Sequence, residues 1–294
     1  MPGGLHPPAE VVTSWPKLNA IDPERKNWSL VIHTIVLFTI TLFVVCARFW
    51  ARCKVQRNAG LDDALIAVAM VPLLGLAIST CLSSRYYGFD RHIWDLTVSQ
   101  ASESRRAVMA MEVFYILTTG PIKISILCFY RRLSTGTIST KFIWTVWLSI
   151  ASVIGYMVAF MIALFATCRP IDAYWNFMDP AWTSKHEYTC ADEAAILFSA
   201  VIISMIQDII TCVLPIWFVW NLQLAKRQKI AVAGIFLVGF LTCIAGALRM
   251  YYIHRVYYET YDITWAAEEG WLWTMIESHL GIICASAPAL KIFF

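Results

Sequence analysis

Charged side chains are scarce in this chain of 294 residues. Asp, Glu, Lys and Arg make up 15% of the sequence, whereas 59% of it is hydrophobic. Because soluble globular domains carry about 25% charged residues, this composition excludes an ordinary soluble domain. It predicts a membrane protein whose first partner is the lipid bilayer.

Basic blocks and cofactor motifs are also missing. The net charge is only +3, and Lys and Arg occur in short clusters that flank apolar runs, which argues against nucleic-acid binding. The six histidines form no His-x-x-x-His or Glu-x-x-His pair on a helix face, as metal sites often do. No glycine-rich phosphate loop is present. We therefore expect no metal site and no cofactor.

A cleavable signal peptide is missing as well. Residues 1–27 are polar, contain five prolines and include no short apolar core before a small-residue cleavage site. We expect residues 1–27 to form an extramembrane N-terminal segment and residues 28–294 to form one membrane domain. Asn27 begins an Asn-Trp-Ser sequon and is therefore a candidate glycosylation site beside the membrane.

Seven apolar segments follow, each near the ~20 residues that a helix needs to cross about 30 Å of hydrocarbon. They lie near residues 29–50, 62–83, 108–130, 142–167, 194–221, 229–252 and 271–293. The sequence thus predicts an all-α, polytopic membrane protein built as a seven-transmembrane-helix bundle.

The connecting loops predict the orientation of this bundle. The first, third and fifth loops contain Lys and Arg but no Asp or Glu, whereas the other three are longer and mix acids with bases. Because positive loops stay on the cytoplasmic side, we expect the N-terminus outside and the C-terminus inside. The last segment ends almost at Phe294, so we expect essentially no cytoplasmic tail.

Three of the nine cysteines, Cys81, Cys168 and Cys190, lie at or beyond the outer face in this topology, where disulfides persist. Three thiols cannot all pair. We favour a disulfide between Cys168 and Cys190, which closes the fourth loop across 21 intervening residues; the alternative is two free thiols. The second and fourth loops are rich in aromatic residues, which indicates either packed lids or an aromatic belt at the membrane surface.

Two charged residues, Glu112 and Lys123, lie within the third segment. The eleven-residue spacing corresponds to about three helical turns, so both lie within roughly 20° of one face. A charge in hydrocarbon costs at least about 2.5–3.5 kcal/mol, so these side chains should face the bundle interior and find partners. Asp208 and Glu277 are the partners that we expect.

These residues define two polar layers. An outer layer holds Glu112, Arg249 and Glu277, and an inner layer holds Lys123 and Asp208. Ionisable residues inside a membrane indicate a functional site by default, although buried pairs can also serve only to fix helix register.

Asp62 and Asp63 open the second segment just after Gly60, and several basic residues precede them on the cytoplasmic side. Carboxylates at a helix N-terminus are favourable because of the helix dipole. One interpretation is a helix cap with interfacial ion pairs to Arg48, Arg52 and Arg57. The other is a lock whose breaking would open the cytoplasmic face.

Two membrane-protein classes are disfavoured. A retinal pigment needs a lysine deep in its last helix, but the last segment offers only Lys291 at its inner edge. The two halves show no evident inverted repeat, which weakens a transporter interpretation.

An ordered set of motifs resembles the fungal rhodopsin-like domain family of integral membrane proteins. The motifs are RNAGLDDALI at 57–66, IKISILCFYRRL at 122–133, CRPIDAYW at 168–175, LPIWFVWNLQL at 214–224 after Asp208, then Arg249, and GIICASAPALK at 281–291 after Glu277. The resemblance implies a seven-helix fold with the N-terminus outside and no retinal. Relatives are described as candidate G-protein-coupled receptors or as secondary-metabolite cluster proteins, some of them membrane-bound cyclases.

Two functions therefore compete. The first is a secondary-metabolite biosynthesis protein, an acid–base cyclase acting on a lipophilic terpenoid or meroterpenoid intermediate, with Glu277, Glu112 or Asp208 as the catalytic acid. The second is a receptor-like small-molecule sensor that would act through a G protein. The expected lack of a cytoplasmic tail favours the enzyme. The description of many relatives as candidate receptors favours the sensor.

Both functions use the same interior site. Cationic and aromatic side chains should bind the lipophilic small molecule there. The π faces of tryptophan rings can stabilise positive charge that develops on this molecule. The candidates are Lys123, Arg249, Trp94, Trp175 and Trp273. We expect the protein to reside in the endoplasmic reticulum or the plasma membrane.

Overall fold

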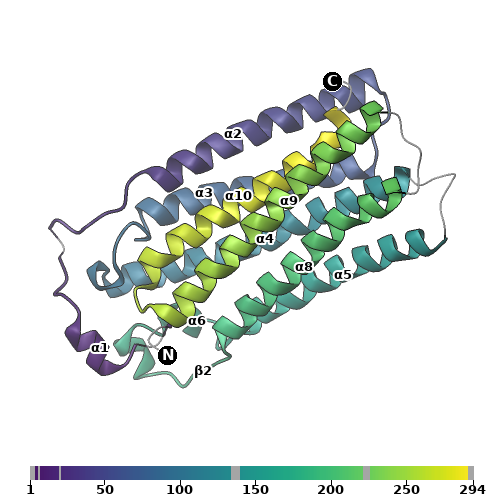
Figure 1. The fold of residues 1–294 in the computed structure, drawn as a ribbon. Coiled ribbons are helices and arrows are strands. Elements are labelled where there is room, and N and C mark those ends of the chain that lie inside the picture. Colours follow the sequence, from purple (N-terminus) through teal and green to yellow (C-terminus); the bar gives the residue numbers. More distant parts are fainter. Residues whose placement is uncertain (1–3, 6, 20, 134–139, 221–225, 291–294) are drawn as a thin grey trace.

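The computed structural model describes the chain apart from residues 1–3, 6, 20, 134–139, 221–225 and 291–294. The side chains of residues 133 and 215–235 also lie outside this description. Long helices run side by side along one direction and form an elongated bundle (Figure 1). We call the end with the N-terminal segment and the β-strands the outer end, and the opposite end the inner end, following the predicted orientation.

The protein is almost entirely helical. In chain order its elements are α1 (Ala9–Ser14), α2 (Ser29–Trp50), η1 (Ala51–Val55), α3 (Leu61–Arg85), η2 (Ile93–Asp95), α4 (Val98–Leu133), α5 (Thr140–Ala166), β1 (Cys168–Arg169), α6 (Ala173–Asn176), α7 (Pro180–Thr183), β2 (Thr189–Cys190), α8 (Glu193–Trp220), α9 (Lys226–His254), η3 (Arg255–Glu259) and α10 (Ile263–Leu290).

Six of the long helices, α2, α3, α4, α5, α8 and α9, are long and apolar enough to cross a membrane. This confirms an all-α, multi-pass membrane protein. The seventh long helix, α10, has 28 residues and packs against α9, α2 and α4. It carries Glu268, Glu277 and His279, all of them buried, and no described stretch of it is as apolar as the membrane spans of the other six. Its crossing of the membrane and the orientation of the bundle stay predictions, as does the division at residue 28.

Two helices begin earlier than the apolar pattern predicts. The predicted segments 108–130 and 271–293 correspond to α4 from Val98 and α10 from Ile263. The added turns are polar and extend toward the outer end, where Arg105 and Glu268 find ionic partners. Hydropathy finds only the part of a helix that lipid surrounds, so it missed these turns.

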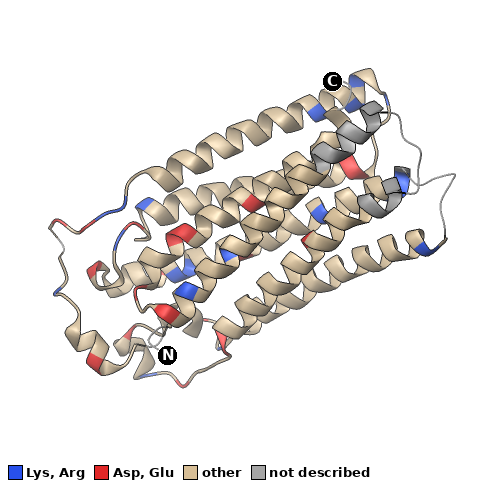
Figure 2. Cartoon of the chain, in the orientation of Figure 1, with Lys and Arg blue, Asp and Glu red and all other residues tan. Residues whose placement is uncertain are grey.

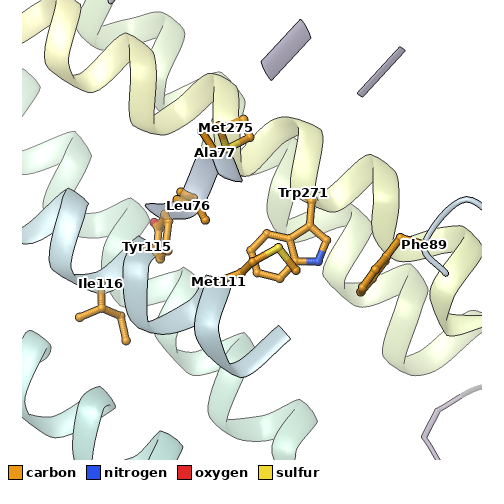
Figure 3. Packing of buried hydrophobic residues seen from close by; sticks show 8 residues of the cluster. All are labelled: Leu76, Ala77, Phe89, Met111, Tyr115, Ile116, Trp271 and Met275. Atoms are coloured by element: carbon orange, nitrogen blue, oxygen red, sulfur yellow. The ribbon is translucent and has the colours of Figure 1, made fainter. Parts of the chain in front are cut away.

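The core lies where α3, α4 and α10 meet. Eight buried residues form a cluster there: Leu76, Ala77, Phe89, Met111, Tyr115, Ile116, Trp271 and Met275 (Figure 3). Gly120 lets α5 approach α4 closely, because a Cβ at this position would overlap the side chain of Met157. By contrast, Phe43 and Leu148 are largely exposed on α2 and α5, as lipid-facing side chains would be.

The fourth loop is a packed structure at the outer end. Strands β1 and β2 pair antiparallel with Cys168 opposite Cys190, and these two cysteines form a disulfide, as the sequence predicts. Tyr174 of α6 is 1% exposed. Cys81 remains a free thiol. Of the two interpretations of this loop, the structure fits a packed lid.

Candidate functional site

The predicted inner layer is an ion pair. Lys123 of α4 places its Nζ 3.0 Å from Oδ1 of Asp208 on α8. The same amine donates hydrogen bonds to the carbonyl oxygen and Oγ of Ser204, at 2.8 and 2.9 Å. All three of these contacts to the Lys123 amine come from α8, and they supply the partners that a buried ammonium group requires.

The predicted outer layer contains a second ion pair. Arg249 of α9 places its Nε 3.0 Å from Oε2 of Glu277 on α10, and each side chain is no more than 5% exposed. The guanidinium carbon of Arg249 lies 4.2 Å from the centroid of the Tyr115 ring. The Tyr115 hydroxyl donates to Oε1 of Glu277 at 2.6 Å. Both oxygens of Glu277 thus face a donor or a cation. Figure 2 shows how few charged residues lie within the bundle between its ends.

Tyr115 and Ser204 join the two layers. The Tyr115 hydroxyl lies 3.2 Å from Oγ of Ser204, which itself accepts from Lys123. Sequence reasoning missed Tyr115 because its ring belongs to the apolar core. A signal was present, since Tyr115, Thr119 and Lys123 follow each other at four-residue spacing on one helix face.

Three cavities border this network, and a fourth, larger one lies beyond them at the outer end. An outer cavity of about 80 Å³ is lined by Arg105, Glu112, Arg249, Trp271 and Thr274 among others. A side cavity of about 20 Å³ also includes Glu112, Tyr115 and Arg249. An inner cavity of about 40 Å³ includes Lys123, Asp208 and Glu277. A vestibule of about 620 Å³ at the outer end shares Leu5, Arg105 and Tyr257 with the outer cavity.

The Arg249–Glu277 pair lies between two of these cavities. Arg249 lines the outer cavity and the side cavity, whereas Glu277 lines the inner cavity. A ligand that contacts Arg249 from the outer or the side cavity can therefore alter the contacts of Glu277, on the wall of the inner cavity, through this one ion pair.

Glu112 differs from the other two predicted acids. It lines the outer and side cavities with Arg249. Within the described part of the chain, its carboxylate has no ion pair within 4.0 Å and no side-chain hydrogen bond. Asp208 and Glu277, in contrast, each have a cation at 3.0 Å.

A second ionic cluster, which the sequence did not reveal, lies where the vestibule meets the outer cavity, since Arg105 and Tyr257 line both. Arg105 of α4 forms a bidentate pair with Glu193 at the start of α8. The hydroxyls of Tyr174 and Tyr257 donate to Oε1 of Glu193 at 3.2 and 2.9 Å. Burial raises the pKa of Tyr174 well above its usual range, so this phenol remains a donor. Both charged residues lie outside the predicted apolar segments or at their edge, and this is why they were missed.

The three predicted tryptophans lie away from the cavities described above. Trp94 stacks on His92 at 4.5 Å near the outer end. The centroid of the Trp175 ring lies 5.4 Å from the guanidinium carbon of Arg106. Trp273 is half-buried on α10. Trp271, two residues earlier and hence on the opposite side of that helix, lines the outer cavity instead. Asn27, the predicted glycosylation site, is exposed just before α2.

Asp62 and Asp63 form a buried cluster at the inner end. Arg48 donates to Asp63 at 2.8 Å and to Asp62 at 2.9 Å, and Arg52 and Arg132 approach Asp62 within 3.5 Å. Asp63 also accepts from the backbone N–H of Gly60, which caps α3. The predicted cap and the predicted pairs to Arg48 and Arg52 are present and buried inside the protein. The predicted pair to Arg57 is not found among the described residues, where Arg57 is exposed and Arg132 takes part instead.

With this geometry in hand, comparison with known proteins identifies the family. The model of the fungal rhodopsin domain matches residues 47–294. The chain belongs to the fungal rhodopsin domain family. No solved structure matches this family member.

Several curated relatives cover nearly the whole chain. The protein named Receptor GIN3 of Arthrobotrys oligospora is 29% identical over 98% of this chain and 68% of its own length. Wortmanamides biosynthesis cluster protein C of Talaromyces wortmannii is 26% identical, over 92% and 72%. Polyenoic acids biosynthesis gene cluster protein Ba17b of Metarhizium anisopliae is 23% identical, over 92% and 74%. The similarity thus links this fungal rhodopsin domain protein both to a receptor and to biosynthesis clusters.

Proposed function

We propose that this chain is a receptor-like sensor of a small amphiphilic molecule. The observation that carries the proposal is the position of the Arg249–Glu277 pair between the outer and inner cavities. A ligand group that accepts hydrogen bonds from Arg249 competes directly with Glu277. The released carboxylate then acts on the inner layer, where Lys123 and Asp208 pair.

The shape of the cavities suggests how such a ligand would bind. The outer cavity of about 80 Å³ holds a few waters or a polar head group. The adjoining vestibule of about 620 Å³ lies within the ~300–1,000 Å³ range of ligand pockets and has room for an apolar tail. The ligand would be a lipophilic molecule with an acidic head directed at Arg249.

The name of one relative suggests a probe of this class. A polyenoic acid, the product named for the Metarhizium cluster, combines an apolar chain with a carboxylate. A carboxylate forms strong, charge-assisted hydrogen bonds with a guanidinium. The relative named as a receptor aligns over 98% of this chain. This similarity supports the proposal that such a ligand is sensed rather than chemically converted.

The pairing of the acids argues against Glu277 and Asp208 as proton donors. A general acid must hold a proton at the start of the reaction. Each of these carboxylates instead lies 3.0 Å from a cation, so a basic side chain, and not a substrate, occupies the position beside the acid. Their arrangement suits an ionic switch better than acid catalysis.

Binding of a fluorescent polyenoic acid tests the sensor proposal. Parinaric acid would be titrated into purified protein in lipid nanodiscs, with empty nanodiscs as the baseline. Arg249→Met should weaken binding at least ~10-fold, because a hydrogen bond to a charged group contributes about 1.5–3 kcal/mol. Arg255→Met is the matched control, since Arg255 is 48% exposed near the same end of α9, and it should bind like the wild type.

Two outcomes would reject this proposal. Binding to the wild type that does not exceed binding to empty nanodiscs would exclude an acidic polyene as the ligand class. Equal affinities of the wild type and a folded Arg249→Met variant would exclude Arg249 as the head-group site.

A second candidate function is the acid–base cyclase, and the position of Glu112 favours it. This carboxylate lines two cavities without a close cation in the described part of the chain, as a desolvated general acid would. The substrate would be a lipophilic terpenoid or meroterpenoid intermediate. Relatives named for the wortmanamides and satratoxin biosynthesis clusters support a biosynthetic role.

A microsomal assay tests the enzyme. Membranes that contain the wild type would convert an epoxidised prenylated precursor, and Glu112→Gln would abolish conversion at unchanged protein level. Glu103→Gln is the control, because Glu103 is exposed on the same helix and pairs with Arg106. Full turnover by Glu112→Gln would exclude Glu112 as the acid.

A further inference from the structure

Hydrogen bonds connect the inner ion pair to the outer one without interruption. Lys123 bonds to Oγ of Ser204 at 2.9 Å, Ser204 to the hydroxyl of Tyr115 at 3.2 Å, and Tyr115 to Oε1 of Glu277 at 2.6 Å. All four residues are at most 5% exposed. They come from α4, α8 and α10, so the path crosses the interior of the bundle.

The donors and acceptors fix one direction along this path. An ammonium group can only donate and a carboxylate can only accept. Ser204 therefore accepts from Lys123, and Tyr115 donates to Glu277. The remaining contact then has Ser204 as donor and Tyr115 as acceptor. Tyr156 also forms a hydrogen bond with Ser204, so it is a second acceptor for the same hydroxyl proton. Each hydroxyl then accepts one proton and donates one, which is the arrangement that a stepwise proton transfer requires.

We propose that Ser204 and Tyr115 form a proton path between Lys123 and Glu277. In the transfer, an N–H bond of Lys123 breaks and its proton binds Oγ of Ser204. The original hydroxyl proton of Ser204 passes to the oxygen of Tyr115, and the phenolic proton of Tyr115 passes to Oε1 of Glu277. The products are a neutral amine and a neutral carboxylic acid, and no other bond changes.

The trigger of this transfer rests on the proposed sensor function. When a ligand takes Arg249 away from Glu277, a buried carboxylate loses its cation, which is strongly unfavourable. A proton from Lys123 neutralises that carboxylate. The amine then loses its charge, and its attraction to Asp208 at 3.0 Å falls. Ligand binding at the outer cavity is thereby converted into opening of the inner ion pair.

Other groups near this path can also exchange protons. Glu112 of α4, Tyr156 of α5 and Asp208 of α8 act electrostatically on Arg249 or Glu277. Waters in the inner cavity could bridge Lys123 and Glu277 directly, because both residues line it. The experiment must therefore separate the hydroxyl path from a water path.

Infrared spectroscopy after a one-sided pH jump makes this separation. Proteoliposomes would be captured through a tag at one end of the chain so that one orientation is measured. The protonated-carboxyl band of Glu277 would be assigned by its loss in Glu277→Gln. After acidification at the inner end, this band should form at least ~100-fold more slowly in Tyr115→Phe and Ser204→Ala than in the wild type, the scale of a positioned proton-transfer group. After acidification at the outer end, the rates should be unchanged.

Tyr130→Phe is the matched control. Tyr130 is a buried tyrosine on the same helix that lines the inner cavity but makes none of the contacts of the path, so its removal should leave both rates unchanged. Wild-type rates in Tyr115→Phe and Ser204→Ala would overturn the proposal and indicate transfer through cavity water. Absence of the Glu277 band at all pH values in the wild type would overturn it as well. No ligand is used, so failure of the sensor proposal would not alter these results.

Discussion

Two groups of buried charges differ in their surroundings. At the inner end, Arg48 is 1% exposed and lies between Asp62 and Asp63, at 2.9 and 2.8 Å; it also donates to the carbonyl oxygen of Ala285. In the middle of the bundle, Arg249 and Glu277 form one pair at 3.0 Å. None of the four cavities described above includes a residue of the inner-end ion pairs, whereas three of them include Arg249 or Glu277.

This difference separates a structural cluster from a candidate site. Burial and pairing are common to both groups, so neither property alone indicates function. The inner-end cluster joins α2, α3 and α4 through mutually satisfied charges and also bonds to α10. The central pair leaves an arginine on the wall of one cavity and a glutamate on the wall of another, where a small molecule or water can change the contact.

The largest expected effect is the loss of the inner-end cluster. Arg48→Met should lower the free energy of unfolding by about 3–5 kcal/mol, because it leaves two aspartates buried without their principal cation. Unfolding in nanodiscs, followed by tryptophan fluorescence, measures this change. Arg57→Met is the control, since Arg57 is exposed at the same end, and its effect should stay within ~0.5 kcal/mol. Equal stability of the two variants would show that the cluster is not structural.

An intermediate effect is expected from the disulfide at the outer end. The bond closes a loop with a sequence separation of 22 residues, so the double variant Cys168→Ser, Cys190→Ser should unfold with about 3 kcal/mol less free energy. Reductant should lower the free energy of unfolding of the wild type to that of the double variant. Cys81→Ser serves as control, because this cysteine is a free thiol and should change little. Resistance of the wild type to reductant would contradict the prediction.

The smallest expected effect on stability concerns the inner layer. The double variant Lys123→Met, Asp208→Leu replaces a buried ion pair by apolar side chains, which is often neutral, so we expect a change within about 1 kcal/mol. Asp208→Leu alone leaves Lys123 unpaired and should be clearly less stable. Comparison of the single and double variants by thermal unfolding separates pairing from net stabilisation. A double variant as unstable as the single one would make this pair structural, like the inner-end cluster.

Particular residues show how far sequence reasoning reached. The cost of charge in hydrocarbon predicted that Lys123 would find Asp208 and that Arg249 and Glu277 would share a layer, and both pairs are present. Tyr115 was missed because a tyrosine serves both an apolar core and a hydrogen bond. Trp273 was chosen where Trp271 lines the cavity, because the rotation of α10 depends on its packing against α2, α3, α4 and α9.

The sequence by itself determined that the chain forms membrane-crossing helices, which charges lie inside them and that those charges favour ionic partners, which Lys123, Asp208, Arg249 and Glu277 have and Glu112 lacks in the described part of the chain. Each of these follows from transfer free energies that depend only on residue type and spacing. Only the tertiary structure decided that Arg249 and Glu277 face different cavities and that Ser204 and Tyr115 connect the two layers. These features depend on the relative rotation and depth of α4, α8, α9 and α10, which close packing of side chains sets and which no single segment encodes.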